Sequence, residues 1–104
     1  MTRQFDVYRN PLRSGRELRP FVLAIQRQFW DPLPTCVVMP LVVKAALDFQ
    51  PRLNPAFKIE GQTLYLSPTE PLTLPTRLLR GPVANLEQER YRIVAALDLV
   101  FTGV

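Results

Sequence analysis

The chain has 104 residues, 47% of them hydrophobic and 21% charged, a composition that predicts one globular domain over residues 1–104. It contains no histidine and a single cysteine, which excludes imidazole acid–base catalysis, histidine-ligated metal and an internal disulfide. No apolar run is long enough to span a membrane and no signal segment opens the chain, so we expect a cytoplasmic protein.

Positive charge is concentrated near the start of the chain, which carries a net charge of +4 in all. The arginines of this first segment are Arg3, Arg9, Arg13, Arg16 and Arg19. Only Asp6 and Glu17 oppose them there. The segment is either a surface for an acidic partner, such as nucleic acid or an acidic protein segment, or a solvated basic loop. The residues alone leave both interpretations open.

The first half of the chain predicts two strands joined by a loop. Residues 4–8 alternate between apolar and polar, as in a half-buried strand with Phe5 and Val7 on one face. Residues 9–20 contain two turn signals and predict an exposed loop. Residues 21–28 are apolar at nearly every position up to residue 25, which predicts a central strand covered on both faces.

A third strand is predicted over residues 36–43. Pro40 interrupts it and should mark an edge, a bulge or the end of the strand. We interpret Cys36 as a small buried hydrophobe and not as a nucleophile, because no histidine is present to activate it. The preceding loop, 29–34, contains Trp30, which is either a core residue or an exposed anchor; the core is favoured because Trp is largely buried on average.

The second half begins with a short helical turn predicted over residues 44–49. Residues 57–66 predict a hairpin that turns at Glu60 and Gly61. The segment 67–75 contains three prolines and predicts a loop, and 76–79 predicts a last short strand. About six short strands followed by one helix indicate a mainly β fold of the α+β class, a strongly bent antiparallel sheet or open barrel.

The C-terminal segment predicts the single helix, over about residues 85–101. Asn85 can cap its first turn with Gln88 as capping-box partner, and Gly103 can adopt the left-handed conformation that ends a helix. The apolar residues at helical spacing are Leu86, Ile93, Leu97 and Val100. A short apolar tail held by a helix can insert into a partner, whereas most tails are frayed and inactive.

Four segments of the chain form an ordered set: Gln4-Phe5-Asp6-Val7-Tyr8, Phe21-Val22, Val37-Val38-Met39-Pro40-Leu41 and Phe101-Thr102-Gly103-Val104. In this order they resemble the CcdB family of bacterial toxins, the DNA gyrase poisons of toxin–antitoxin modules. The resemblance extends over essentially the whole chain.

The resemblance implies an SH3-like open barrel with a small second sheet and a C-terminal helix, assembled as a homodimer. It implies a protein without catalytic activity or cofactor that binds the gyrase A subunit and traps the enzyme on cleaved DNA. A CcdA-like acidic antitoxin would neutralise it. The toxin–antitoxin complex would repress its own operon, with the antitoxin contacting the operator DNA.

By resemblance, the gyrase contact falls on Phe101, Thr102, Gly103 and Val104. The family carries a tryptophan where this chain has Thr102, and that ring stacks on an arginine of gyrase. A tryptophan hot spot contributes at least about 2 kcal/mol, so its loss weakens each contact roughly thirtyfold. One alternative is therefore a homologue that retains the fold but is inactive on gyrase.

Two further assignments concern the basic segment. Its charge predicts an antitoxin-binding patch at Arg9, Arg13, Arg16 and Arg19. The other alternative is an mRNA-cleaving toxin of the MazF/Kid type, which shares this barrel. In that case Arg13, Arg16 and Arg19 would assist acid–base chemistry together with a carboxylate, although the sequence shows no carboxylate pair to accompany them.

Overall fold

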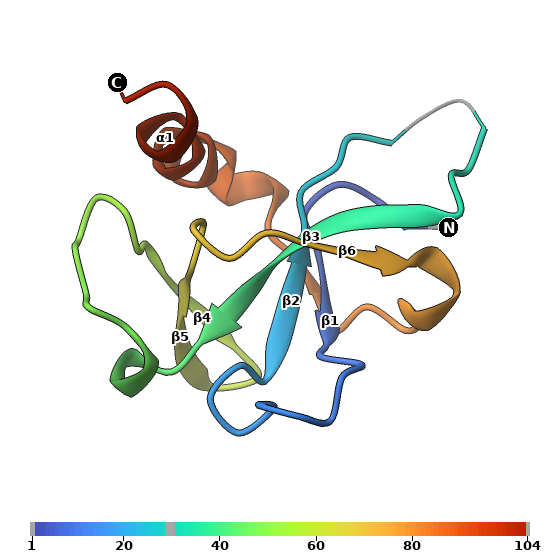
Figure 1. Ribbon diagram of the computed structural model, residues 1–104, viewed down its shortest axis with the longest axis horizontal. Coiled ribbons are helices and arrows are strands. Elements are labelled where there is room, and N and C mark those ends of the chain that lie inside the picture. The colour runs from blue at the N-terminus through green and yellow to red at the C-terminus, as the bar shows by residue number, and fades with distance from the viewer. Residues whose placement is uncertain (1, 29–30, 104) are drawn as a thin grey trace.

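The computed structural model describes residues 2–28 and 31–103 (Figure 1). Its strands are β1 (Asp6–Arg9), β2 (Phe21–Ala24), β3 (Thr35–Val42), β4 (Ala56–Ile59), β5 (Gln62–Leu66), β6 (Leu72–Pro75) and β7 (Ala84–Asn85). Three 3₁₀ turns, at Lys44–Ala46, Thr76–Leu78 and Glu87–Glu89, precede the helix α1 at Arg90–Phe101. Trp30, predicted to lie in the core, is outside the described residues.

The strands form one antiparallel sheet in the order β4-β5-β3-β2-β1-β7, with β6 paired to β3 outside this path. The long strand β3 holds the sheet together, because β6 pairs with its first half and β5 with its last two residues (Figure 1). The sheet curls into a nearly closed barrel with the single helix at one side. This architecture confirms the predicted α+β class and the SH3-like barrel. The small second sheet that the resemblance implied is not separate in the described residues, because β6 pairs with β3 within the one sheet.

β3 continues through Pro40 to Val42 in the middle of the sheet, so the expectation of an edge, a bulge or a strand end was wrong. The carbonyl of Pro40 accepts a hydrogen bond from the Ser67 N–H at 3.1 Å. The amide nitrogen and carbonyl of one strand residue point to the same side. The position of the missing N–H of Pro40 therefore faces Ser67, where the neighbour of β3 changes from β6 to β5, and not β2, so the pairing of β3 with β2 is unaffected.

Apolar side chains cover both faces of β2, as its sequence predicted. Phe21 and Leu23 lie in the main core, whereas Val22 and Ala24 belong to a second, smaller core on the other face. The buried residues of the main core are Phe5, Val7, Phe21, Leu23, Met39, Leu41, Phe57, Ile59, Leu64, Leu66, Ile93 and Ala96. Val7 of β1 faces this main core together with Phe5, which precedes the strand at φ 71°. Asp6 and Tyr8 on the other face of β1 are also buried, so the prediction of a half-buried strand was wrong.

The helix begins at Arg90, five residues later than predicted, because Ala84 and Asn85 pair with β1 as the strand β7. Asn85 pairs with Asp6, and the Leu86 N–H donates to the Phe5 carbonyl at 2.9 Å. The predicted cap by Asn85 does not form, because the N-cap positions of the 3₁₀ turn and of α1 are Leu86 and Glu89, neither with a side-chain cap hydrogen bond. The Asn85 side-chain oxygen instead accepts from the Glu87 N–H at 2.9 Å in an Asx turn.

Two further predictions about the second half were wrong, and two were confirmed. Residues 67–75, predicted as a loop, contain the strand β6, whose single proline, Pro75, is its last residue. Residues 76–79, predicted as a strand, contain the 3₁₀ turn Thr76–Leu78. Prolines at strand ends remove no central ladder hydrogen bond. The hairpin forms as predicted, with Glu60 at φ 51° and Gly61 at φ 79°, and the helical turn forms at Lys44–Ala46.

The burial of α1 yields a direct test. Ile93 is fully buried in the main core, whereas its neighbour Val94 is 37% exposed. We expect Ile93→Ala to lower the free energy of unfolding by about 2–5 kcal/mol, because it leaves a cavity under the helix. The matched control Val94→Ala should change it by less than about 1 kcal/mol. Urea denaturation measures both, and equal effects would show that α1 does not pack as described.

Candidate functional site

The C-terminal end of α1 is exposed, and its last turn is closed by the Asp98 carbonyl. The N–H groups of Thr102 and Gly103 donate to this oxygen at 2.8 and 3.0 Å, and Gly103 has φ 76° as predicted. Phe101 is 63% exposed. Val104 lies outside the described residues. Phe101 therefore offers the largest apolar surface of the described tail.

The side chain of Thr102 is turned back onto the helix. Its hydroxyl donates to the Asp98 carbonyl at 2.8 Å, so its donor is already used within the chain. What remains for a partner is its methyl group, the hydroxyl lone pairs and the exposed backbone of the tail. The residue at the position of the family tryptophan thus provides little contact surface of its own.

The other end of α1 is fixed by two arginines. The Arg90 guanidinium lies 4.9 Å from the centre of the Phe5 ring, and Arg92 lies 4.7 Å from that of Phe57. Arg92 also donates to the Ala56 carbonyl in β4 at 2.7 Å. These contacts attach the first turn of the helix to the segment before β1 and to β4.

Each of these arginines is itself held by a glutamate one turn earlier. Arg90 pairs with Glu87 at 3.1 Å, and Arg92 pairs with Glu89 at 2.7 Å. Sequence reasoning missed this pair of anchors, although the three-residue Glu–Arg spacing is visible in the sequence. The helix is consequently fixed at its start, and its exposed end projects from the barrel (Figure 1).

The structure divides the predicted antitoxin-binding arginines into two pairs. Arg9 forms an ion pair with Glu60 at 2.9 Å, and Arg19 forms one with Glu70 at 2.8 Å. Arg13 and Arg16 are exposed and form no ion pair with any described residue. Arg13 and Arg16 are therefore the arginines of this loop whose charge is left for a partner.

A cleft of about 290 Å³ lies beside this loop, between it and the start of β6. Leu12 and Leu72, 41% and 38% exposed, contribute apolar surface to it, and Arg19 and Glu70 also line it. Figure 1 places the loop, drawn in blue, at the opposite side of the molecule from the C-terminus. The two predicted contact surfaces are thus separate.

The family model described as CcdB protein matches residues 4–103. The chain belongs to the CcdB family. It is therefore a toxin of a CcdA/CcdB-type toxin–antitoxin module, and an antitoxin is its partner. A comparison with curated proteins gives no significant match. Among the residues that the structure describes, no helix of this CcdB-family protein is long and apolar enough to cross a membrane.

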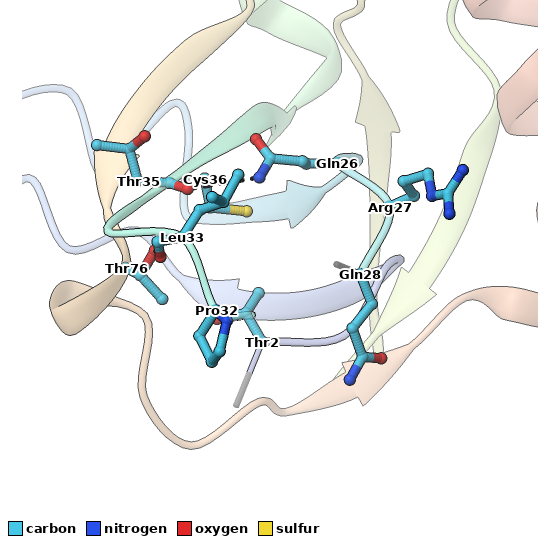
Figure 2. Close-up of a pocket in the computed structure, with 9 residues that line it drawn as sticks. All are labelled: Thr2, Gln26, Arg27, Gln28, Pro32, Leu33, Thr35, Cys36 and Thr76. Carbon is cyan, nitrogen blue, oxygen red and sulfur yellow. Dashed lines mark hydrogen bonds between the residues drawn. The ribbon is translucent and has the colours of Figure 1, made fainter. Parts of the chain in front are cut away.

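A small cavity of about 40 Å³ in this CcdB-family protein lies beside Cys36, where β2 ends (Figure 2). The Gln26 side chain continues the pairing there, because it accepts from the Val37 N–H at 3.1 Å and donates to the Thr35 carbonyl at 3.5 Å. Burial raises the pKa of the Cys36 thiol, which disfavours the nucleophilic thiolate. The predicted burial of Cys36 is confirmed, and the cavity has room for only a few water molecules.

Proposed function

We propose that this CcdB-family toxin binds the A subunit of DNA gyrase through the end of α1 and traps the gyrase–DNA cleavage complex. It acts by binding and not by catalysis. The observation that carries this proposal is the 63% exposure of Phe101 on a helix whose first turn is anchored to the barrel. Aromatic residues on rigid supports dominate many protein interfaces.

The contact is weaker than one made with a tail tryptophan. Thr102 cannot stack on an arginine, and its hydroxyl is bonded to the Asp98 carbonyl. The remaining contact comes from Phe101, the exposed Gly103 backbone and Val104. This geometry also favours one alternative, a homologue that retains the fold and the antitoxin but is inactive on gyrase. For the mRNA-cleaving alternative, Arg19 lies beside one carboxylate, Glu70 at 2.8 Å, while Arg13 and Arg16 form no ion pair with a described residue.

Exchange of the tail residue tests the gyrase proposal. Wild-type toxin incubated with gyrase and supercoiled DNA should accumulate cleaved DNA, and Thr102→Trp should do so at roughly thirtyfold lower concentration. Phe101→Ala should abolish the effect, while Thr63→Ala, at an exposed position of β5, should leave it unchanged. Absence of cleaved DNA with both wild type and Thr102→Trp would contradict gyrase poisoning and leave the fold and antitoxin partnership intact.

We also propose that the toxin is a homodimer, which would present two tails to its target. The exposed large apolar residues of the described chain support an association of this kind: Leu12, Leu18, Leu33, Leu72, Tyr91, Val94 and Phe101. Light scattering at micromolar concentration should give twice the chain mass of 12.0 kDa. A mass of one chain under these conditions would contradict the dimer.

For the antitoxin, we propose an acidic segment that docks at the loop of Arg13 and Arg16. The neighbouring cleft supplies apolar contacts from Leu12 and Leu72, and the two arginines supply unpaired positive charge. This combination fits a chain that alternates acidic and apolar residues. The antitoxin-bound toxin would in turn repress its own operon.

Charge reversal tests the antitoxin surface. Arg13→Glu with Arg16→Glu should weaken antitoxin binding at least about tenfold and flatten its salt dependence, because like charges then face each other. Calorimetry at two salt concentrations measures both effects. The control Arg77→Glu with Arg80→Glu introduces the same charge change on the segment after β6 and should bind normally. Unchanged affinity of the loop variant would show that the loop is only solvated.

A further inference from the structure

Two more arginines without an ion pair lie on the segment that follows β6. Arg77 and Arg80 are exposed, and neither forms an ion pair with any residue in the described part of the chain. Both line a cleft of about 450 Å³ together with Thr2, Tyr8 and Thr76. Neither the gyrase proposal nor the antitoxin proposal uses this cleft.

Hydrogen bonds fix the segment that carries these arginines. The Thr76 hydroxyl donates to the Leu33 carbonyl at 2.8 Å, and the Thr76 N–H donates to the Pro34 carbonyl at 2.8 Å. Arg80 Nε donates to the Arg77 carbonyl at 3.2 Å. This bond folds the Arg80 side chain back over the turn while its two terminal nitrogens remain available as donors.

The rest of the cleft lining is uncharged. Tyr8 is buried, and its hydroxyl donates to the Asp6 carboxylate at 3.0 Å. Burial raises the pKa of Tyr8 to about 12, so the phenol remains neutral at physiological pH. The Asp6 carboxylate lies behind it and also accepts from the Arg3 N–H and the Asn85 side chain. Among the described residues that line the cleft, the charged groups are therefore the two guanidinium groups.

We propose that this cleft holds a phosphate group of the DNA backbone, so that the toxin itself contacts DNA when the toxin–antitoxin complex binds its operator. A guanidinium fork matches phosphate oxygens, and contacts of this kind position a protein on DNA without reading its sequence. The lining offers two exposed arginines, and the hydroxyl of the buried Tyr8 already donates to Asp6 and is not available to a free anion. The proposal rests on operon repression by the complex, not on gyrase binding.

The test measures binding of the toxin–antitoxin complex to a labelled duplex from the promoter of its own operon, by fluorescence anisotropy over a range of salt concentrations. Arg77→Gln with Arg80→Gln should lower the affinity about tenfold and reduce the salt slope by about 1, the signature of one lost phosphate contact. Arg52→Gln with Lys58→Gln removes the same charge from two exposed residues elsewhere and should change both quantities less. Antitoxin affinity, measured in parallel, should be equal in all complexes.

If both double variants lost the same DNA affinity and the same salt slope, only the net charge would matter and the proposal would be overturned. The proposal would also be overturned if the complex with both Arg77→Gln and Arg80→Gln bound DNA as tightly as the wild-type complex. If inorganic phosphate stabilises the isolated toxin while that variant binds DNA normally, the cleft is a free-anion site and the DNA assignment is wrong. The gyrase cleavage assay is independent of all these results, so failure of the gyrase proposal remains distinguishable.

Discussion

The docking of α1 on the barrel is the contact on which the rest of the structure depends. β4 and β7 are the two ends of the sheet path, and the helix that follows β7 reaches back to β4. Ile93 and Ala96 complete the main core, while Arg90 and Arg92 hold the helix against Phe5 and Phe57. Without the helix, this core would face water and the β4 edge would lie open to pairing with other chains.

A buried carboxylate sets the position from which the helix starts. Asp6 accepts hydrogen bonds from the Tyr8 hydroxyl and the Asn85 side chain, at 3.0 and 2.9 Å. The second of these bonds joins β1 to β7, a strand of only two residues. β7 in turn leads directly into the 3₁₀ turn and α1. The location of the tail therefore depends on the buried contact between Asp6 and Asn85, because β7, the 3₁₀ turn and α1 follow one another directly.

Local patterns in the sequence predicted much of the fold and the exposure of the tail. The apolar run of β2 and the Glu60–Gly61 turn depend on neighbours in the chain, so the sequence predicts them. The alternation at residues 4–8 predicted a half-buried strand, but Asp6 and Tyr8 are buried by contacts with distant parts of the chain. The continuation of β3 through Pro40 depends on which strands pair beside it. The ion pairs of Arg9 and Arg19 join residues 51 positions apart, so the sequence could not show that half of the predicted arginine patch is neutralised. The late start of α1 has the same origin, since pairing of Asn85 with Asp6 overrides its helical tendency.

The tail and the basic loop lie on opposite sides of the molecule. Under the proposed function, an antitoxin docked at the loop would have to extend along the toxin to displace gyrase from the tail. The most direct test of the account is hydrogen–deuterium exchange of the toxin with and without the gyrase A subunit. We predict slower exchange at residues 99–103, at the exposed end of α1, with exchange over residues 10–19 unchanged. Slower exchange in the loop with no change at the end of α1 would contradict the central claim that the anchored helix presents the target-binding tail.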